Sequence, residues 1–395
     1  MRPLFYEKNS QIAVSVAETD GVWTLSTSKT ISPEQGYVAV SKNDSLITNR
    51  EVYVVDSIKA GKGQGNSDDS IYARILKPIF EDLIHIKHHY VATTSAESIA
   101  EFASSLPSSP EPKLVIILGG DTSISEFVNG IGESLNSGLI DLAVIPTGTG
   151  NALALSLGIG DVHSALQRLF TSTLSKPLNV YLALLPEGTQ KVFRGEFVGN
   201  APKKYYFLVV LSWAFHASLV ADSDTEQLRQ YGNERFKIAA GKNLSRPQKY
   251  EGTVLIKSKE KVVKTNGPFS YLIVTPVQEF EPGFRILPRG NVFDLSLYLL
   301  TVGYEHEESI SGKYLFDVMM EAYDNGKHID NPRVSYKEVT LDQNIILEGE
   351  NLLPAYTRRF CVDGAIVLLP ENEKATIQIQ PEGSQLGDWK LQVLT

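Results

Sequence analysis

The chain has 395 residues, which is enough for two domains with hydrophobic cores of their own. Its composition, 42% hydrophobic and 21% charged, is that of a globular protein, and its formal net charge of −9 argues against nucleic acid as a main partner. The single cysteine excludes a disulfide framework, and no apolar run of about 18 residues predicts a membrane-spanning helix. Because the start is too polar for a signal peptide, we expect a cytoplasmic protein.

Residues 1–49 contain short alternating runs that predict strands, too few for a separate domain. We expect a β-rich extension that either joins the rest of the protein or forms a small sheet. Over 50–177 strand-like runs alternate with helical patterns, which predicts an α/β domain with a parallel sheet and helices on both faces. Over 178–395 short strands follow one another, which predicts a β-rich domain with an antiparallel sandwich.

The α/β part begins with a buried strand over 51–55, followed by a glycine-rich stretch over 60–69. A helix is predicted over 69–83, where isoleucine or leucine recurs at every fourth position. The three histidines between 85 and 89 have a spacing that could suit a metal. Exposed histidines at a helix end are the favoured interpretation, because no carboxylates cluster near them.

The most informative stretch is 113–157, where an apolar run twice ends in a glycine-rich corner and continues as a helical pattern. The first corner contains Gly119-Gly-Asp, and the second contains Gly148-Thr-Gly-Asn. Strand, helix and strand in succession form a right-handed crossover, so the two strands should be parallel. Both corners should then lie at one edge of the sheet, where open α/β sheets bind ligands.

Glycine at such corners lets backbone N–H groups approach a phosphate and aims a helix N-terminus at its negative charge. We therefore predict a phosphate-binding cradle lined by both corners. Asp121 would repel a bare phosphate, so its carboxylate indicates either a cation such as Mg²⁺ or a proton acceptor. Glycine-rich corners that bind nothing are common as well, and this alternative stays open for either corner alone.

The two corners resemble known signatures. Leu118-Gly-Gly-Asp-Thr-Ser-Ile-Ser-Glu-Phe-Val-Asn-Gly resembles the Gly-Gly-Asp-Gly-Thr…Glu-Val-Val-Asn-Gly signature of the diacylglycerol kinase catalytic domain superfamily, which includes sphingosine, ceramide and bacterial lipid kinases. Pro146-Thr-Gly-Thr-Gly-Asn-Ala-Leu-Ala resembles its second nucleotide motif, in the form closest to the sphingoid-base kinases. The resemblance extends in scattered blocks from about residue 50 to about residue 370. It implies nucleotide binding in the first domain and lipid binding in the second.

The resemblance implies ATP contacts in the first domain from Thr94, Gly119, Gly120, Thr122, Ser123, Thr147, Gly148, Gly150 and Asn151. Asp121 is the candidate catalytic base, and Asp121 and Asp294 are the candidate contacts for Mg²⁺. Thr122 and Ser123 depart from the family's Gly-Thr. That departure either narrows the cradle or offers a hydroxyl ligand.

The β-rich part contains Ser212-Trp-Ala-Phe-His, which resembles a Trp-Gly-Phe block of the superfamily. That block implies that Arg229 and Arg235 lie near the nucleotide phosphates. They are six positions apart, so the helical insertion expected over 224–240 must break between them, and Gly232 permits the break. The alternative is a salt-bridged surface formed with the neighbouring carboxylates. His216 is interpreted as a packed residue.

Other positions depart further from the family. Strict register puts Ser218 at the acidic residue near the lipid headgroup, with Asp222 close but shifted, so both are candidate substrate contacts. Asp363 and Gly364 keep the family's Val-Asp-Gly-Glu turn near the nucleotide, but the glutamate is Ala365. Further strands are expected over 192–197 and 390–393, and a second helical insertion over 309–324.

The favoured hypothesis is an ATP- and Mg²⁺-dependent lipid kinase that transfers the γ-phosphoryl group to a primary hydroxyl of a sphingoid base or acylglycerol. Such a protein would contact intracellular membranes peripherally, and a homodimer is left open. One alternative is a catalytically impaired regulatory homologue that binds nucleotide or lipid, as Thr122 and Ala365 indicate. The other is a kinase of a soluble cofactor such as NAD, against which the Asn-Ala-Leu-Ala block argues.

Overall fold

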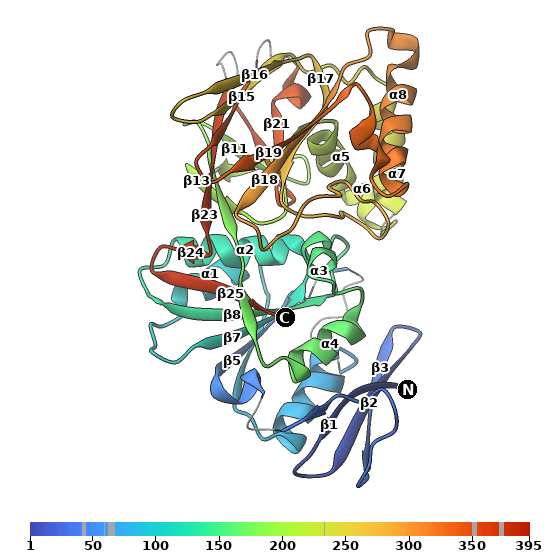
Figure 1. Ribbon diagram of the computed structural model, residues 1–395, viewed down its shortest axis with the longest axis vertical. Coiled ribbons are helices and arrows are strands. Elements are labelled where there is room, and N and C mark those ends of the chain that lie inside the picture. The colour runs from blue at the N-terminus through green and yellow to red at the C-terminus, as the bar shows by residue number, and fades with distance from the viewer. Residues whose placement is uncertain (42–44, 59, 62–67, 233, 350–353, 371–374) are drawn as a thin grey trace. The chain divides into compact units, whose positions relative to one another are not determined.

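The chain forms two compact units in the computed structural model (Figure 1). The first comprises Met1–Leu178 and Ser384–Thr395, and the second comprises Asn179–Gly383. The structure describes all residues except 42–44, 59, 62–67, 233, 350–353 and 371–374. Most of the glycine-rich stretch expected over 60–69 therefore lies outside the described residues. Among those described, no helix is long and apolar enough to cross a membrane.

The first unit contains a mainly parallel sheet with the strand order β24-β25-β8-β7-β5-β6 (Figure 1). The strands β5, β6, β7, β8 and β25 pair in parallel, whereas β24 and β9 pair antiparallel with β25. Its strands are β5 (Glu51–Asp56), β6 (His88–Ala92), β7 (Lys113–Gly119), β8 (Gly138–Pro146), β9 (Ser175–Pro177), β24 (Gln385–Leu386) and β25 (Trp389–Leu394). β7 is buried along its whole length, as its continuous apolar run predicts.

The place of β25 differs from the prediction. The run over 390–393 was expected in the β-rich domain, but β25 lies parallel to β8 in the sheet of the first unit. Trp389 is fully buried there and packs against Gly138, where a Cβ would come within 2.8 Å of the indole ring. An alternating pattern identifies a strand but not its partner, so the sequence alone could not reveal this return of the chain.

The helices of the first unit are α1 (Ser98–Ser105), α2 (Asp121–Gly132), α3 (Ala152–Ser156) and α4 (Val162–Thr171), with a 3-10 turn η1 (Leu46–Asn49). The helix predicted over 69–83 consists largely of the π-helical segments η2 (Tyr72–Leu76) and η3 (Ile79–Leu83). An α-helix turns every ~3.6 residues, so a strict four-residue spacing drifts around it. Within these π-helical segments Ile75 and Ile79 are nevertheless both fully buried.

Residues at the start of the chain form a separate sheet in the order β3-β2-β1-β4, in which β1, β2 and β3 pair antiparallel and β4 pairs in parallel with β1. Its strands are β1 (Arg2–Glu7), β2 (Ile12–Thr19), β3 (Val22–Lys29) and β4 (Ala39–Val40). The sheet packs against α4, where the rings of Phe5 and Phe170 lie 5.0 Å apart and His163 Nε2 lies 2.8 Å from the carbonyl oxygen of Pro3. Of the two alternatives for 1–49, the structure therefore has the small sheet.

The second unit is built from two antiparallel sheets, in the orders β13-β10-β23-β20-β15-β16 and β12-β11-β22-β21-β14-β17-β18-β19. Its strands are β10 (Val180–Leu184), β11 (Gln190–Phe193), β12 (Glu196–Asn200), β13 (Lys204–Phe207), β14 (Leu211–Ala214), β15 (Gly252–Lys257), β16 (Val262–Asn266), β17 (Phe269–Thr275), β18 (Ser296–Gly303), β19 (Val334–Thr340), β20 (Asn344–Gly349), β21 (Arg359–Val362), β22 (Ala365–Leu368) and β23 (Ala375–Gly383). One apolar cluster joins Tyr181 and Val254 of the first sheet to Leu211 and Leu272 of the second. The unit is therefore β-rich, with its core between the two sheets.

Two further predictions for the second unit are corrected in detail. The expected strand over 192–197 is a hairpin, because Arg194 and Gly195 have φ angles of 52° and 86° and turn the chain between β11 and β12. The insertion expected over 224–240 is divided into short helices. The helical segments are α5 (Phe215–Ser223), α6 (Glu226–Arg229), α7 (Glu234–Leu244), α8 (Glu308–Met320), η4 (Glu321–Tyr323), η5 (Lys327–Asp330) and η6 (Ala355–Arg358).

Candidate functional site

The parallel strands of the first unit end at one edge, and both glycine corners lie there. β7 ends at Gly119 and β8 at Pro146, and the register places these two residues opposite each other. The carboxyl ends of the neighbouring strands β5 and β6 lie at the same edge. The structure thus brings these predicted nucleotide contacts to one sheet edge: Thr94, Gly119, Gly120, Thr122, Ser123, Thr147, Gly148, Gly150 and Asn151.

The two corners touch through their backbones. A Cβ on Gly148 would lie 2.4 Å from the Cα of Gly120, and a Cβ on Gly120 would lie 2.6 Å from the carbonyl oxygen of Gly150. The N–H groups of Thr147 and Gly148 donate to the carbonyl of Gly119 at 3.1 and 3.2 Å. The glycines therefore serve the contact between the corners, in addition to any approach of a phosphate.

A third loop reaches the same place. Gly61 has a φ of +54°, and a Cβ there would lie 2.2 Å from the carbonyl oxygen of Thr147. Only glycine combines this left-handed backbone with so close an approach. Gly61 is the one glycine of the stretch 60–69 that the structure describes, and it serves the packing of this loop against Thr147.

Asp121 joins the corners through its side chain. Its carboxylate accepts hydrogen bonds from the N–H groups of Ala152 (2.8 Å) and Leu153 (3.0 Å), which begin α3, and its own N–H donates to Gly150. A carboxylate at a helix N-terminus is stabilised by the helix dipole. Burial nevertheless raises the pKa of the Asp121 carboxyl, although the two amides oppose that shift. A raised pKa makes the carboxylate a stronger proton acceptor.

The side chains around the corners differ in how open they are. Thr122, in the first turn of α2, and Thr94 are exposed, whereas Ser123 is buried. Thr94 is held beside α1, because its N–H donates to the hydroxyl of Ser98 at 3.0 Å. The Asn151 amide donates to the carbonyl of Gly148 at 2.8 Å, and its Oδ1 is buried with no hydrogen-bond partner among the described residues. An unpaired buried acceptor next to glycine-rich turns is an available ligand group.

One acidic residue at this edge was missed. Asp56 ends β5, is 5% exposed, and accepts a hydrogen bond from the Tyr90 hydroxyl at 3.0 Å. Burial raises its pKa, which the bond from Tyr90 partly offsets. The sequence contained a signal for Asp56, because this residue comes directly after the buried strand predicted over 51–55. The Gly119-Gly-Asp corner likewise comes directly after a buried strand.

In the second unit, Arg229 and Arg235 converge on one carboxylate. Arg229 Nη1 lies 3.1 Å and Arg235 Nη1 lies 3.6 Å from Asp224 Oδ1. Gly232, with a φ of +55°, allows the break between α6 and α7 that this convergence needs. The structure thus has the salt-bridged alternative, with both arginines on one acidic side chain, and their place near nucleotide phosphates stays a prediction.

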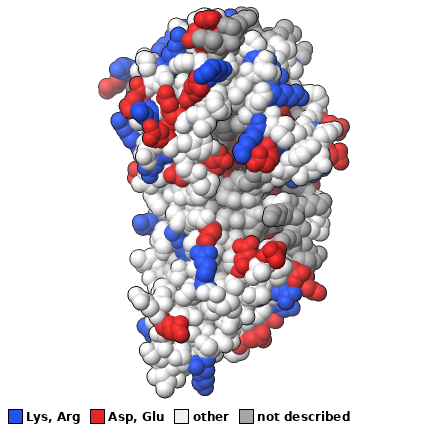
Figure 2. Space-filling model, turned by 90° about the vertical axis from the view of Figure 1, so that its right-hand side faces the viewer, with Lys and Arg blue, Asp and Glu red and all other residues white. Residues whose placement is uncertain are grey.

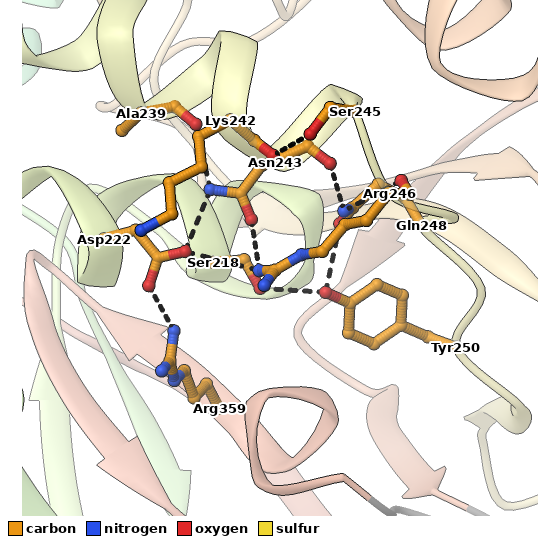
Figure 3. Close-up of polar contacts among 10 residues, drawn as sticks. All are labelled: Ser218, Asp222, Ala239, Lys242, Asn243, Ser245, Arg246, Gln248, Tyr250 and Arg359. Atoms are coloured by element: carbon orange, nitrogen blue, oxygen red, sulfur yellow. Dashed lines mark hydrogen bonds and ion pairs between the residues drawn. The ribbon is translucent and has the colours of Figure 1, made fainter.

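The two predicted substrate contacts lie one turn apart on α5, in the polar network of Figure 3. Ser218 is fully buried and its hydroxyl lies 2.8 Å from that of Tyr250. The Asp222 carboxylate lies between Arg359 and Arg246, at 2.5 and 3.3 Å, and also accepts a bond from Asn243. Asp222 is therefore compensated within the chain, and the two guanidinium groups leave the network with excess positive charge.

Asp363 and Gly364 form the turn between β21 and β22, with φ angles of 47° and 88°. The carboxylate of Asp363 is buried and accepts hydrogen bonds from three successive backbone amides, those of Leu208, Val209 and Val210, at 2.7–2.9 Å. This arrangement fixes the loop before β14. The nucleotide contact that the resemblance implies for Asp363 stays a prediction, and the carboxylate already binds these three amides.

The predicted metal contacts Asp121 and Asp294 belong to the first and the second unit, respectively. Among the described residues, no group of three or more histidine, cysteine, aspartate and glutamate side chains could hold a metal ion. Asp294 accepts a bond from Asn291 at 3.2 Å. His88 Nε2 lies 2.9 Å from the Tyr72 hydroxyl, while the ring of His89 stacks on Tyr53. His85 is exposed just after η3, as predicted, whereas His88 and His89 lie in β6.

These features define a two-unit protein with a glycine-rich edge on its α/β sheet and a β-rich second unit. Residues 52–183 match the diacylglycerol kinase catalytic domain. This segment contains both glycine corners, so the resemblance seen in their residues is confirmed for this part of the chain.

The chain is similar to one relative over a short segment and to solved structures over most of its length. Sphingosine kinase B of Dictyostelium discoideum is 37% identical over 78 residues, which cover 19% of this chain and 10% of that protein. The match thus spans a tenth of that relative. A candidate diacylglycerol kinase of Bacillus anthracis str. Sterne superposes with a TM-score of 0.57 at 16% identity, covering 87% of this chain and 95% of that one. A second structure of that name gives 0.56 at 16% identity, covering 87% and 97%. These structures share the fold.

Proposed function

We propose that the protein is an ATP-dependent lipid kinase that phosphorylates a hydroxyl of a sphingoid base or acylglycerol. The observation that carries this proposal is the pair of glycine corners, locked together by Asp121 at the carboxyl edge of the sheet, inside the segment that matches the diacylglycerol kinase catalytic domain. Phosphoryl transfer depends mainly on positioning and on electrostatic stabilisation, and this edge offers both.

The phosphates of ATP fit the exposed side of the corners. The hydroxyl of Thr122 is exposed in the first turn of α2, at a helix N-terminus that favours negative charge, while the N–H groups of Asp121 and Ser123 already donate to the carbonyls of Gly150 and Gly120. The unpaired Oδ1 of Asn151 suits a hydroxyl or a metal-bound water. Mg²⁺ in kinases is commonly bound by one or two carboxylates together with the phosphates, and Asp121 and Asp56 would supply them while the ion neutralises charge on the transferred group.

The chemical step asks for one proton acceptor. The acceptor hydroxyl attacks the γ-phosphorus, the bond between that phosphorus and the β–γ bridging oxygen breaks, and ADP leaves. The hydroxyl proton passes to a carboxylate, for which Asp121 is the candidate, because each of its oxygens keeps a lone pair beyond the bond to α3.

The test is phosphorylation by the purified chain with labelled ATP and Mg²⁺. Sphingosine, diacylglycerol, monoacylglycerol and ceramide are offered separately, with NAD as a soluble acceptor. Label on one lipid that disappears in Asp121→Asn supports the proposal, provided that the variant keeps its unfolding temperature. Label on NAD alone, or undiminished turnover in the variant, would contradict it.

A second candidate is a regulatory homologue that binds nucleotide or lipid without turnover. Three observations favour it: Ala365 stands at the family's glutamate, the Asp363 carboxylate is occupied by backbone amides, and Asp224 holds both arginines. This candidate predicts saturable ATP binding with no labelled product on any of the four lipids. The same assay, run beside a binding titration, separates the two functions.

A further inference from the structure

The hairpin formed by β15 and β16 carries an unusual concentration of lysine. Between 257 and 264 the chain has Lys257, Lys259, Lys261 and Lys264 against a single acidic residue, Glu260. All four lysines are exposed. We call this surface the lysine hairpin. It stands out because the whole chain is acidic, with a formal net charge of −9.

The lysines of this hairpin differ from other exposed lysines of the second unit in their partners. Lys203, Lys237, Lys313 and Lys327 each form an ion pair with a nearby carboxylate. In the part of the chain that the structure describes, no carboxylate forms an ion pair with a lysine of the hairpin. By contrast with the hairpin, the face of the molecule drawn in Figure 2 has basic and acidic side chains interspersed.

The strand register places part of the hairpin's charge on one flat surface. Lys257 pairs with Val262, and Leu255 pairs with Lys264, so these four side chains share the face of the sheet opposite to the buried Val254 and Ile256. Val262 is 55% exposed, and β16 is the edge strand of its sheet. The surface therefore has apolar side chains set between lysines, with the two remaining lysines in the turn.

We propose that the lysine hairpin docks the protein on a bilayer that contains anionic phospholipid. Clustered lysines are attracted to such a surface, and their long aliphatic stems can lie along it beside Val262 and Leu255. A nucleic acid fits the hairpin less well, because residues 257–266 contain no aromatic side chain on which bases could stack. The proposal rests on the proposed function in one respect, since a lipid acceptor would be met at a membrane.

The experiment is sedimentation of the full chain with vesicles, without ATP. Vesicles of phosphatidylcholine mixed with phosphatidylserine are compared with vesicles of phosphatidylcholine alone, at several salt concentrations. One variant replaces the four hairpin lysines by glutamine. The matched control replaces Lys203, Lys237, Lys313 and Lys327 by glutamine, which removes the same charge from the same unit. Melting curves of both variants establish that they fold.

We expect the wild type to bind the anionic vesicles and to be released by salt. The hairpin variant should lose affinity by about fivefold per lysine, or two to three orders of magnitude in all, and the control should stay within a few-fold of the wild type. Equal loss in the two variants would show a general charge effect and overturn the proposal. Wild-type binding to RNA but not to vesicles would do so too.

A second measurement separates vesicle binding by the lysine hairpin from lipid phosphorylation. Turnover is assayed with the acceptor lipid dispersed in neutral detergent micelles, where an anionic surface is absent. The hairpin variant should phosphorylate the lipid there as the wild type does. If the wild type binds anionic vesicles through the hairpin but forms no labelled lipid, the proposed function fails and the docking surface stands.

Discussion

Replacing Gly148 by alanine tests whether the contact between the corners creates the nucleotide site. The added Cβ would lie 2.4 Å from the Cα and 2.6 Å from the nitrogen of Gly120. Both neighbours are backbone atoms, so no side chain can rotate away and one corner must move. Overpacking of this kind costs about 1–3 kcal/mol. Because the corners hold each other through Asp121, the displacement should reach the start of α3 as well.

Gly160→Ala is the matched control. It lies in the loop between α3 and α4, and a Cβ there would meet nothing within 4 Å. Its effect on the free energy of unfolding should stay within about 0.5 kcal/mol. Differential scanning calorimetry is the suitable measurement, because two units of this size can unfold in separate transitions. Gly148→Ala should lower the Tm of the first unit by roughly 2–10 °C.

Binding of ATP supplies the second readout. We expect Gly148→Ala to weaken the affinity by about tenfold or more, since a shift of a few tenths of an ångström misplaces every donor of the cradle. Gly160→Ala should bind as the wild type does. If Gly148→Ala kept both its Tm and its affinity for ATP, the contact between Gly148 and Gly120 would not be what positions the nucleotide site.

Three further predictions concern single side chains. Burial lowers the pKa of His216 to about 4, so its ring is uncharged at neutral pH. Because the unfolded chain takes up the proton first, the free energy of unfolding should fall by up to about 3 kcal/mol as the pH drops from 6.5 towards 4. An NMR titration of His216 with a midpoint near 6.5 would contradict this prediction. Burial alone would raise the pKa of Asp161, but the Ser164 amide and Arg2 lower this pKa to about 2. The stability that the Asp161 carboxylate adds is therefore present above about pH 4 and is lost between about pH 4 and pH 2. Arg2→Ala should reduce this pH dependence, which acid unfolding curves can measure. Asp363→Ala should destabilise the second unit by roughly 3 kcal/mol or more by leaving three buried amides unpaired, and calorimetry should show Asp363→Asn to be milder.

The corners were predictable because their signal is local. Each consists of a buried strand, two or three glycines and a helix start within about a dozen residues, and the parallel arrangement follows from chain connectivity alone. The same holds for the turn at Asp363 and Gly364, where an Asp-Gly pair between two strands specifies a tight hairpin. In these places the chemistry of neighbours in sequence decides the structure.

The partners of charged side chains were not predictable in the same way. Four neighbouring carboxylates could have paired with the arginines of the family block, namely those of Asp222, Asp224, Glu226 and Glu234. Asp224 pairs with both arginines, and Asp222 is bound by Arg359 from β21. Such choices depend on which elements the fold brings together, as does the return of β25 to the first sheet. Periodicity carries no information on pairings between distant segments.

Thr122 and Ala365 both depart from the family's motifs, but their surroundings differ. Thr122 replaces a family glycine but lies exposed in the first turn of α2, so its branch does not separate the corners. Ala365, by contrast, begins β22 and packs against the apolar cluster between the two sheets. Ala365 is partly buried, and a glutamate there would start beside apolar side chains, against which an unpaired carboxylate is costly.

The surroundings of Ala365 therefore suit alanine, and the family's acid cannot simply be restored. Ala365→Glu should lower the Tm of the second unit and leave any lipid phosphorylation no faster than in the wild type. Ala365→Gln, of nearly the same shape and without the charge, separates crowding from charge. A glutamate variant that folded normally and turned over faster would show that the lost acid still has its place in the site, and that catalysis in this chain is impaired at that residue.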